Sequence, residues 1–263
     1  MSDKIKALLL GDVVGQPGCR AIFTSLKKVV KEYKADVVMV NGENAADGFG
    51  LTPENAQLIF SNGADVITSG NHIWQKKEIY PLLDSKENLL RPLNYPKKVP
   101  GHGSCIVNVK GTKVGFINLQ GRVDMFSIDC PFVAAKEEVR KLRKETNIIL
   151  IDFHAENVEE KEALALYLDG QVSSVTGTHT HIQTGDYRIL EKGTAYMTDI
   201  GMTGPMHTVI GSRSDIAIKR QQTQVPLRME IEDIPATING ALITIDAKSG
   251  KALEIIPVNY KSL

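Results

Sequence analysis

Short apolar runs alternate with amphipathic stretches along the first part of the chain. Consecutive apolar residues predict a buried strand, whereas apolar residues three and four positions apart predict a helix. A helix is predicted over residues 20–33, where the apolar positions are Ile22, Phe23, Leu26, Val29 and Val30. Strands are predicted over 6–10, 36–40 and 64–68. A second helix begins at Thr52-Pro53-Glu54, because Thr is a favourable cap and Pro suits the first turn.

The same alternation continues in the second half, with predicted helices over 131–145 and 158–168 and predicted strands over 147–153 and 172–176. Residues 104–109 and 113–118 flank a Lys110-Gly111-Thr112 turn and predict a hairpin. Alternating apolar residues predict three more strands, over 227–232, 240–245 and 252–258. We therefore expect an α/β fold, a four-layer α/β/β/α sandwich of two mixed β-sheets flanked by helices, in a single domain over residues 1–263.

Composition narrows the class of protein and its partners. The 263 residues are 42% hydrophobic and 24% charged, with a formal net charge of zero, as in ordinary soluble globular proteins. Such a chain has no overall field that would attract DNA or an anionic membrane, so we expect neither as a partner. An anionic substrate would have to be held by a local site, to which metal ions can contribute charge.

Cysteine content and the N-terminal segment point to a cytoplasmic protein. Three widely spaced cysteines, Cys19, Cys105 and Cys130, do not suggest a disulfide framework. Cys19 is interpreted as a small buried apolar residue. The first apolar run ends at Gly11-Asp12, which is too early for a signal peptide, and no run approaches the roughly 20 residues that span a bilayer.

Residue types that bind metals follow several of the predicted strands. Ligands in open α/β sheets gather at the carboxyl ends of the strands, so these side chains are expected to converge at one edge. A mixture of carboxylate, amide and imidazole donors suits divalent cations such as Mn²⁺, Fe²⁺ or Zn²⁺. The candidates are Asp12, Glu43, Asn44, Asn71, His72, His154, His179 and His181.

Some of these residues also have structural interpretations. Asp12 could be a helix cap or turn former, and its loop does not match the dinucleotide fingerprint, because Gly11, Gly15 and Gly18 have the wrong spacing. Glu43 and Asn44 could form a polar turn. As a functional pair they place a carboxylate next to an amide, and a shared carboxylate is what holds two cations close together.

The histidines differ in how they are expected to act. Asn71 offers a neutral oxygen to a metal, while the adjacent His72 points elsewhere and is free to act on a substrate. His179 and His181 would face the same way if their segment were extended. His102 and His207 lie in predicted loops and are left out of the site. Arg122 ends a predicted strand and is a weaker candidate for contacting phosphate.

In this order, the segments resemble the calcineurin-like metallophosphoesterases, which carry Gly-Asn-His and Gly-His-x-His motifs on the strand ends of a double β-sandwich. The chain departs from that pattern twice. Val14 stands in place of a histidine, and Glu43 stands in place of a bridging aspartate, with Asn44 beside it. These departures are similar to those of the YmdB-like bacterial phosphodiesterases. The segments that carry this resemblance are 11–15, 41–46, 70–72, 118–122, 152–156, 177–181 and 198–205.

The resemblance implies a cytosolic enzyme with two divalent transition-metal ions, for which Fe and Mn are the first candidates and Zn is the third. One ion would bind Asp12, Glu43, Asn44 and His181. The other would bind Glu43, Asn71, His154 and His179. The implied reaction is the hydrolysis of cyclic nucleotides, 2′,3′-cyclic and also 3′,5′-cyclic forms, by attack of a metal-bridging hydroxide on phosphorus with His72 as general acid.

Two other functions stay open on the sequence alone. A phosphomonoesterase or nucleotidase could use the same dimetal site, and extra basic residues near the metals would favour it. Arg122 and Lys76 are the only hints of such residues. A regulatory protein could bind a nucleotide without turnover, but it would not need His72 as a proton donor. Assembly into a homo-oligomer is left open.

Overall fold

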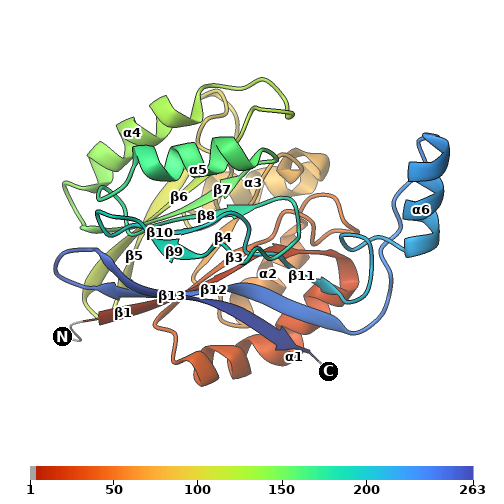
Figure 1. Ribbon diagram of the computed structural model, residues 1–263, viewed down its shortest axis with the longest axis horizontal. Helices are drawn as coiled ribbons and strands as arrows, with labels where there is room; N and C mark the ends of the chain where they lie inside the picture. The colour runs from red at the N-terminus through yellow and green to blue at the C-terminus, as the bar shows by residue number, and fades with distance from the viewer. Residues whose placement is uncertain (1–3, 263) are drawn as a thin grey trace.

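The computed structural model describes residues 4–262 and contains two β-sheets packed face to face (Figure 1). One sheet has the strand order β2-β11-β12-β1-β3-β4, with β13 paired to β12. Its strands are β1 (Lys4–Leu10), β2 (Asp12–Val13), β3 (Val37–Asn41), β4 (Val66–Thr68), β11 (Met202–Pro205), β12 (Ala236–Asp246) and β13 (Ala252–Lys261). Strands β1, β3 and β4 are parallel, and β12 pairs antiparallel with β1.

The second sheet has the strand order β5-β6-β7-β8-β10-β9. Its strands are β5 (Ser104–Val109), β6 (Thr112–Gln120), β7 (Ile148–His154), β8 (Ser174–Thr178), β9 (Arg188–Ile189) and β10 (Ala195–Met197). Strands β6, β7, β8 and β10 are parallel to one another, and β5 pairs antiparallel with β6 as the predicted hairpin.

Alternation along each central strand explains the four layers. In β1, Ala7 and Leu9 pack between the two sheets, whereas Leu8 and Leu10 pack against helices, because successive side chains of a strand point to opposite faces. Helices α1 (Gly15–Tyr33), α2 (Pro53–Ser61) and α3 (Tyr80–Ser85) cover the first sheet. Helices α4 (Pro131–Leu142) and α5 (Val158–Tyr167) cover the second. The predicted α/β/β/α sandwich is confirmed.

The structure corrects two of the predicted elements. Helix α1 begins at Gly15 rather than at residue 20. Pro17 is tolerated there because a first helical turn does not need its N–H. The predicted strand over 227–232 is wrong, since only an isolated bridge between Ser212 and Ile231 forms there. The Ile231 side chain instead packs against Gly15 and Gly48. The apolar residue here therefore fixes a loop to the body of the protein and does not belong to a sheet.

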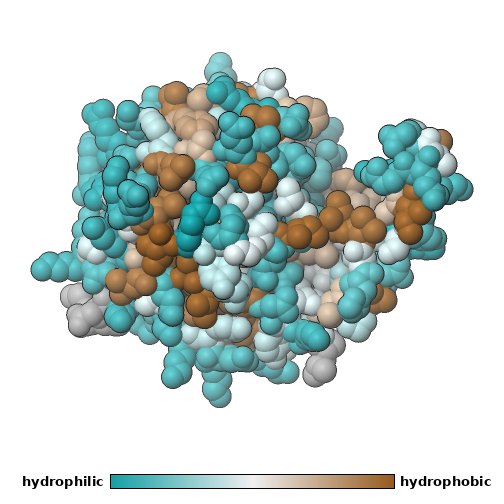
Figure 2. Space-filling view, in the orientation of Figure 1, coloured by the Kyte–Doolittle hydropathy of each residue, from teal (hydrophilic) through white to brown (hydrophobic). Residues whose placement is uncertain are grey.

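Residues 206–235 form an arm that carries α6 (Ser214–Thr223) away from the body (Figure 1). None of the α6 residues is buried. Apolar side chains lie along the connection between the body and α6 (Figure 2), and the exposed ones in this region include Val209, Ile210 and Ile218. Among residues 4–262, no helix is both long enough and apolar enough to cross a bilayer.

Candidate metal centre

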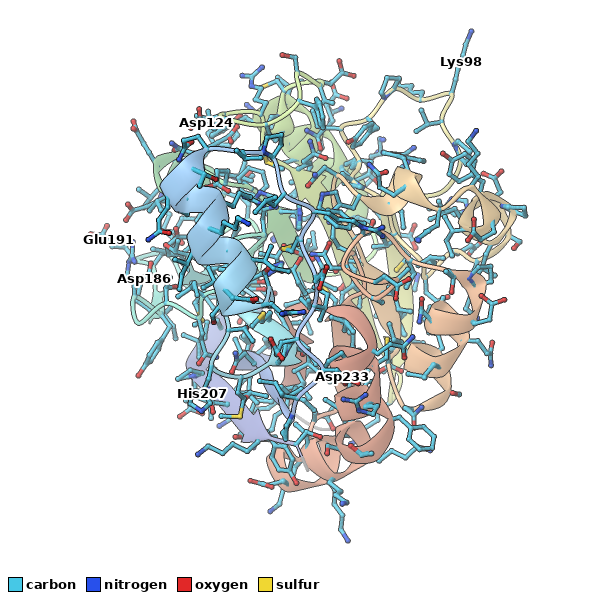
Figure 3. All side chains as sticks on the ribbon, turned by 90° about the vertical axis from the view of Figure 1, so that its right-hand side faces the viewer. Lys98, Asp124, Asp186, Glu191, His207 and Asp233 are labelled. Carbon is cyan, nitrogen blue, oxygen red and sulfur yellow. The ribbon has the colours of Figure 1, made fainter. Side chains whose placement is uncertain are left out.

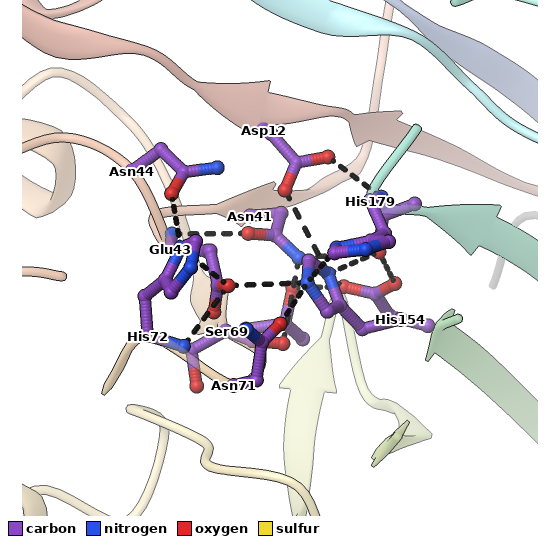
Figure 4. A network of polar contacts seen from close by, with 12 residues as sticks. Asp12, Asn41, Glu43, Asn44, Ser69, Asn71, His72, His154 and His179 are labelled. Atoms are coloured by element: carbon purple, nitrogen blue, oxygen red, sulfur yellow. Dashed lines mark hydrogen bonds and ion pairs between the residues drawn. The ribbon is translucent and has the colours of Figure 1, made fainter. Parts of the chain in front are cut away.

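The parallel strands of both sheets end at the same edge of the sandwich, and the candidate residues meet there; Figure 4 labels all of them except His181. Strands β2, β3 and β4 bring in Asp12, the Glu43-Asn44 pair and the Asn71-His72 pair. Strands β7 and β8 bring in His154 and the 179–181 segment. The first sheet therefore supplies the oxygen donors and His72, and the second supplies the three imidazoles proposed as metal ligands.

One group of donor atoms surrounds Nε2 of His154. This nitrogen lies 3.1 Å from Oε1 of Glu43, 3.2 Å from Oδ1 of Asn71 and 3.0 Å from Nδ1 of His179. The Glu43 carboxylate and the His154 imidazole, at the centre of this group, are both fully buried. These four residues are the set that the sequence assigned to one ion.

A second group surrounds Asn44, and Asp12 lies beside the histidines of the first group. Nδ2 of Asn44 lies 3.1 Å from Nε2 of His181, and Oδ1 of Asn44 lies 2.8 Å from Nδ1 of His72. Asp12 accepts the backbone N–H of His179 at Oδ2, at 3.1 Å, and its Oδ1 is 3.7 Å from Nδ1 of His154. The structure thus brings together all eight residues chosen from the sequence.

Each of the three candidate ligand imidazoles is held at its outer nitrogen. Thr178 Oγ1 lies 3.0 Å from Nδ1 of His154, and the Glu156 carboxylate lies 3.1 Å from Nε2 of His179. The backbone oxygen of Ile210 lies 2.8 Å from Nδ1 of His181. An acceptor at one ring nitrogen places the proton there and turns the lone pair of the other nitrogen toward the cluster.

The backbone of the 179–181 segment differs from the predicted geometry. Strand β8 ends at Thr178, and both His179 (φ 99°) and His181 (φ 66°) have left-handed backbone conformations. The expectation that an extended segment would turn both histidines the same way is therefore wrong. Left-handed conformations are uncommon for residues other than glycine and occur where function or surrounding structure requires them.

Beneath the donors lies a buried polar layer that the sequence did not identify. Asp152 accepts hydrogen bonds from the hydroxyls of Thr68 and Thr178, at 2.5 and 2.8 Å, and from the Asn41 amide at 2.9 Å. It links the two sheets, because Asn41 and Thr68 belong to the first sheet and Thr178 to the second. Asp152 precedes His154 by two positions in a strand, and that spacing could have indicated that it faces the site.

The pKa shifts at the cluster reflect burial and charge. Burial would raise the pKa of Glu43, but His154 and His72 lower it below its ordinary value. Burial would lower the pKa of His154, but Glu43 and Asp12 raise it above its ordinary value. Burial and the charge of His154 lower the pKa of His179 to about 3. Without a cation, the buried Glu43 carboxylate therefore pairs with a protonated His154.

The donor chemistry fits divalent cations. Asp12 Oδ1 and Glu43 Oε2 are buried and have no hydrogen-bond partner, which is costly for carboxylate oxygens unless a positive charge satisfies them. As they stand, no three His, Cys, Asp or Glu side chains within residues 4–262 are arranged to hold an ion. The donor atoms instead contact one another directly, with the amide oxygens of Asn44 and Asn71 among them.

The other residues considered in the sequence make no described hydrogen bond or ion pair with the donor side chains, although His207 lines the same surface pocket as His181. His207 is exposed at the surface (Figure 3), and His102 contacts the backbone oxygen of Asp84. Arg122 has an exposed side chain, and its backbone N–H is held by Glu160. Cys19 is buried as expected, and burial raises its pKa to about 11.

A four-layer sandwich with such donors at its strand ends has a metallophosphoesterase-like fold. The likeness extends to a putative 5′-nucleotidase from Staphylococcus aureus, which is 13% identical with a TM-score of 0.60. The match covers 98% of this chain and 54% of that chain, and at this identity it shows the fold alone.

Closer comparisons define the family. The YmdB-like protein family model matches residues 8–258, and the chain belongs to this family. A Bacillus subtilis (strain 168) protein named 2′,3′-cyclic-nucleotide 2′-phosphodiesterase is 45% identical over 251 residues, 95% of each chain. The crystal structure of a novel phosphatase from Mycoplasma pneumoniae is 33% identical, with a TM-score of 0.92, and covers 100% of this chain and 95% of that chain. The family predicted from the sequence is confirmed.

Proposed function

We propose that this protein is a metal-dependent phosphodiesterase that hydrolyses 2′,3′-cyclic nucleotides, with 3′,5′-cyclic nucleotides as further candidate substrates. The observation that carries the proposal is the pair of buried carboxylate oxygens, on Asp12 and Glu43, that have no hydrogen-bond partner among imidazole and amide donors. The family, which suggests divalent metal ions, and the name of the Bacillus subtilis relative support the same function.

Two divalent cations would share the carboxylate of Glu43. Asp12, Asn44 and His181 would complete one ion's ligands, and Asn71, His154 and His179 would complete the other's. The oxygen-rich donor set favours Mn or Fe, with Zn as the third candidate. When bound, the cations supply positive charge for the phosphoryl oxygens and make a water acidic enough to attack at neutral pH.

His72 is the proton donor in this proposal. Its backbone N–H donates to Glu43 Oε1 at 3.0 Å, and its Nδ1 lies 2.8 Å from Asn44 Oδ1. The Phe49 ring packs edge-on against the imidazole, with 5.1 Å between ring centroids. Asn44 Oδ1 accepts the Nδ1 proton and leaves Nε2 free. The doubly protonated form of His72 would then give its Nε2 proton to the departing ribose oxygen, a role typically worth about 10²–10⁴ in rate.

The charge around the cluster favours a diester over a monoester. A phosphomonoester carries more negative charge, so a site for it needs additional cationic side chains. The described contacts of the donor residues include no lysine or arginine. Lys161, the nearby buried lysine, pairs with Asp199 instead. A singly charged phosphodiester therefore suits the site better.

The proposal is tested with a substrate panel. Protein reconstituted with Mn²⁺ or Fe²⁺ is assayed against 2′,3′-cyclic, 3′,5′-cyclic and linear phosphodiesters, with phosphomonoesters as controls. We expect 2′,3′-cyclic nucleotides to be the best substrates and chelated protein to be inactive. Preferential hydrolysis of monoesters would point to a phosphatase or nucleotidase. Nucleotide binding without any turnover would point to a regulatory protein.

A further inference from the structure

The strained 179–181 turn has to be held in place by its surroundings. His179 and His181 both have left-handed backbones, and a residue in such a conformation persists only where neighbouring groups over-determine it. The residue between them, Thr180, adds two hydrogen bonds to the one that the His179 N–H donates to Asp12. If the turn relaxed, both imidazoles would leave the donor cluster together.

Asp199 holds Thr180 with one carboxylate oxygen. Its Oδ2 accepts the Thr180 backbone N–H at 3.1 Å and the Thr180 hydroxyl at 2.8 Å. Its Oδ1 accepts the backbone N–H of Gly201 at 2.8 Å, which fixes the carboxylate's own orientation. Asp199 is fully buried, so water does not compete for these hydrogen bonds.

Lys161 supplies the counter-charge. Its side chain reaches from α5 and is 1% exposed, and its Nζ lies 3.0 Å from Asp199 Oδ2. A lysine is almost never fully buried unless it is paired, and a buried carboxylate without a cation would be strongly unfavourable. The ion pair therefore allows an ionised Asp199 to stay inside the molecule, where Thr180 meets it.

The backbone leaves this arrangement little freedom. A Cβ added to Gly177, in β8, would lie 1.8 Å from the backbone oxygen of Thr198 and 2.9 Å from Cδ of Lys161. Residue 198, next to Asp199, therefore packs directly against strand β8, which leads into the 179–181 turn. A shift of Asp199 would move Thr180 and, with it, His179 and His181.

We infer that Asp199 and Lys161 are positioning residues, which hold the 179–181 turn so that His179 and His181 present their nitrogens to the cations. The inference rests on the proposed function, since it takes these two histidines as metal ligands. Loss of an outer partner of a metal ligand typically costs about 10–100-fold in metal affinity. We expect Asp199→Asn to weaken Mn²⁺ binding within that range.

Three further variants separate positioning from general stabilisation. Lys161→Met removes the counter-charge and is expected to give the same pattern as Asp199→Asn. Thr180→Val removes only the hydroxyl that Asp199 holds, leaves no buried charge unpaired, and should weaken Mn²⁺ binding by a smaller factor. Thr176→Val is the matched control, because this buried β8 hydroxyl bonds the backbone oxygen of Ile151 and contacts no donor residue.

The experiment measures Mn²⁺ affinity by calorimetry, together with hydrogen exchange of residues 178–182 and the melting temperature of the metal-free proteins. We expect Asp199→Asn, Lys161→Met and Thr180→Val to lose affinity and exchange faster at 178–182, while Thr176→Val does neither. Wild-type affinity and exchange in Asp199→Asn and Thr180→Val, with only a lowered melting temperature, would overturn the inference. A wild-type protein that binds no Mn²⁺ would contradict the proposed function instead, and exchange in the metal-free proteins would still decide whether the pair holds the turn.

Discussion

Glu43 is the residue on which both halves of the donor cluster depend. Its Oε1 lies 3.1 Å from His154 and 3.2 Å from His72, and its Oε2 is buried without a hydrogen-bond partner. Among the described residues, the Asn44 side chain hydrogen-bonds with His72 and His181 and with no other. Glu43 therefore contacts residues of both parts of the donor cluster, whereas Asn44 contacts residues of one part.

We expect Glu43→Gln to be more damaging than Asn44→Ala. A shared carboxylate offsets the repulsion between two close cations, which an amide cannot do. Losing even an outer partner costs about 10–100-fold in affinity, and losing the shared ligand should cost more. Metal content and turnover of both variants at saturating Mn²⁺ give the answer. Equal losses, or a Glu43→Gln protein that retains both ions, would move the bridging role to another carboxylate such as Asp12.

His72 is expected to affect chemistry rather than metal binding. His72→Ala removes the proton donor but leaves the assigned ligands in place, so turnover should fall by about 10²–10⁴. Elemental analysis should show the metal content of the wild type. If one ion is lost instead, His72 is itself a ligand and the general acid has been assigned wrongly.

His154 makes metal binding depend on pH. Burial would lower its pKa, but Glu43 and Asp12 raise it, so the metal-free protein holds a proton there at neutral pH. A cation must displace this proton. Affinity for Mn²⁺ should therefore rise with pH up to the raised pKa of His154. Calorimetry in buffers of different ionisation enthalpy should detect proton release near pH 7, and its absence would show that His154 is already neutral.

For single residues, the sequence predicted the metal-binding side chains better than it predicted the groups that hydrogen-bond to them. Asp12, Glu43 and His154 stand out because each lies within three residues of the end of an apolar run. Thr178, Glu156 and the Ile210 carbonyl, which hold the outer imidazole nitrogens, are common surface or backbone groups until the fold brings them together. Asp199, which accepts two hydrogen bonds from Thr180 in the 179–181 turn, lies 19 residues further along the chain.

The donor residues lie at the ends of strands, and Gly70 shows how closely the ends of β4 and β7 approach each other. It follows β4, and a Cβ at this position would lie 2.1 Å from Cδ2 and 2.3 Å from Nε2 of His154, which ends β7. The imidazole therefore rests directly on the backbone before Asn71. The glycine of the Gly-Asn-His segment is required by this contact between the two sheets.

We expect Gly70→Ala to displace His154 and to weaken Mn²⁺ binding by about 10–100-fold or more. Gly185→Ala is the matched control, because a Cβ there meets no atom within 4 Å. Calorimetric Mn²⁺ titration of both variants makes the comparison. Unchanged affinity in Gly70→Ala would mean that the imidazole can move aside and that its position is not critical.

Periodicity found the central elements but not those that depend on distant partners. Strands β1, β3 and β7 each contain a run of four apolar residues and lie close to where they were predicted. The first turn of α1 was missed because Gly15, Pro17 and Gly18 resemble a loop. The false strand at 227–232 has the right alternation, but only one isolated bridge forms along it. Alternation alone does not show whether a neighbouring strand is available.

The whole molecule is needed to build the site. Each sheet alone would present only half of the donors, and the packing of Ala7, Leu9 and Met39 against Phe116 and Leu150 sets the distance between the halves. Asp152 then joins them at the strand ends through its bonds to Asn41 and Thr178. The four-layer order follows from the sequence, but the alignment of the two edges does not. The predictions of a single domain, a cytoplasmic location and a small-molecule partner stay predictions.

The most direct test of the central claim is turnover of a 2′,3′-cyclic nucleotide measured against the number of Mn²⁺ equivalents bound per chain. Cleavage of the ester at the 2′ oxygen should yield the 3′-phosphomonoester, with no product in metal-free protein. If Glu43 is shared between two cations, turnover should rise until about two equivalents are bound and then level off. Full turnover with one ion or none would contradict the dinuclear phosphodiesterase that the donor cluster supports.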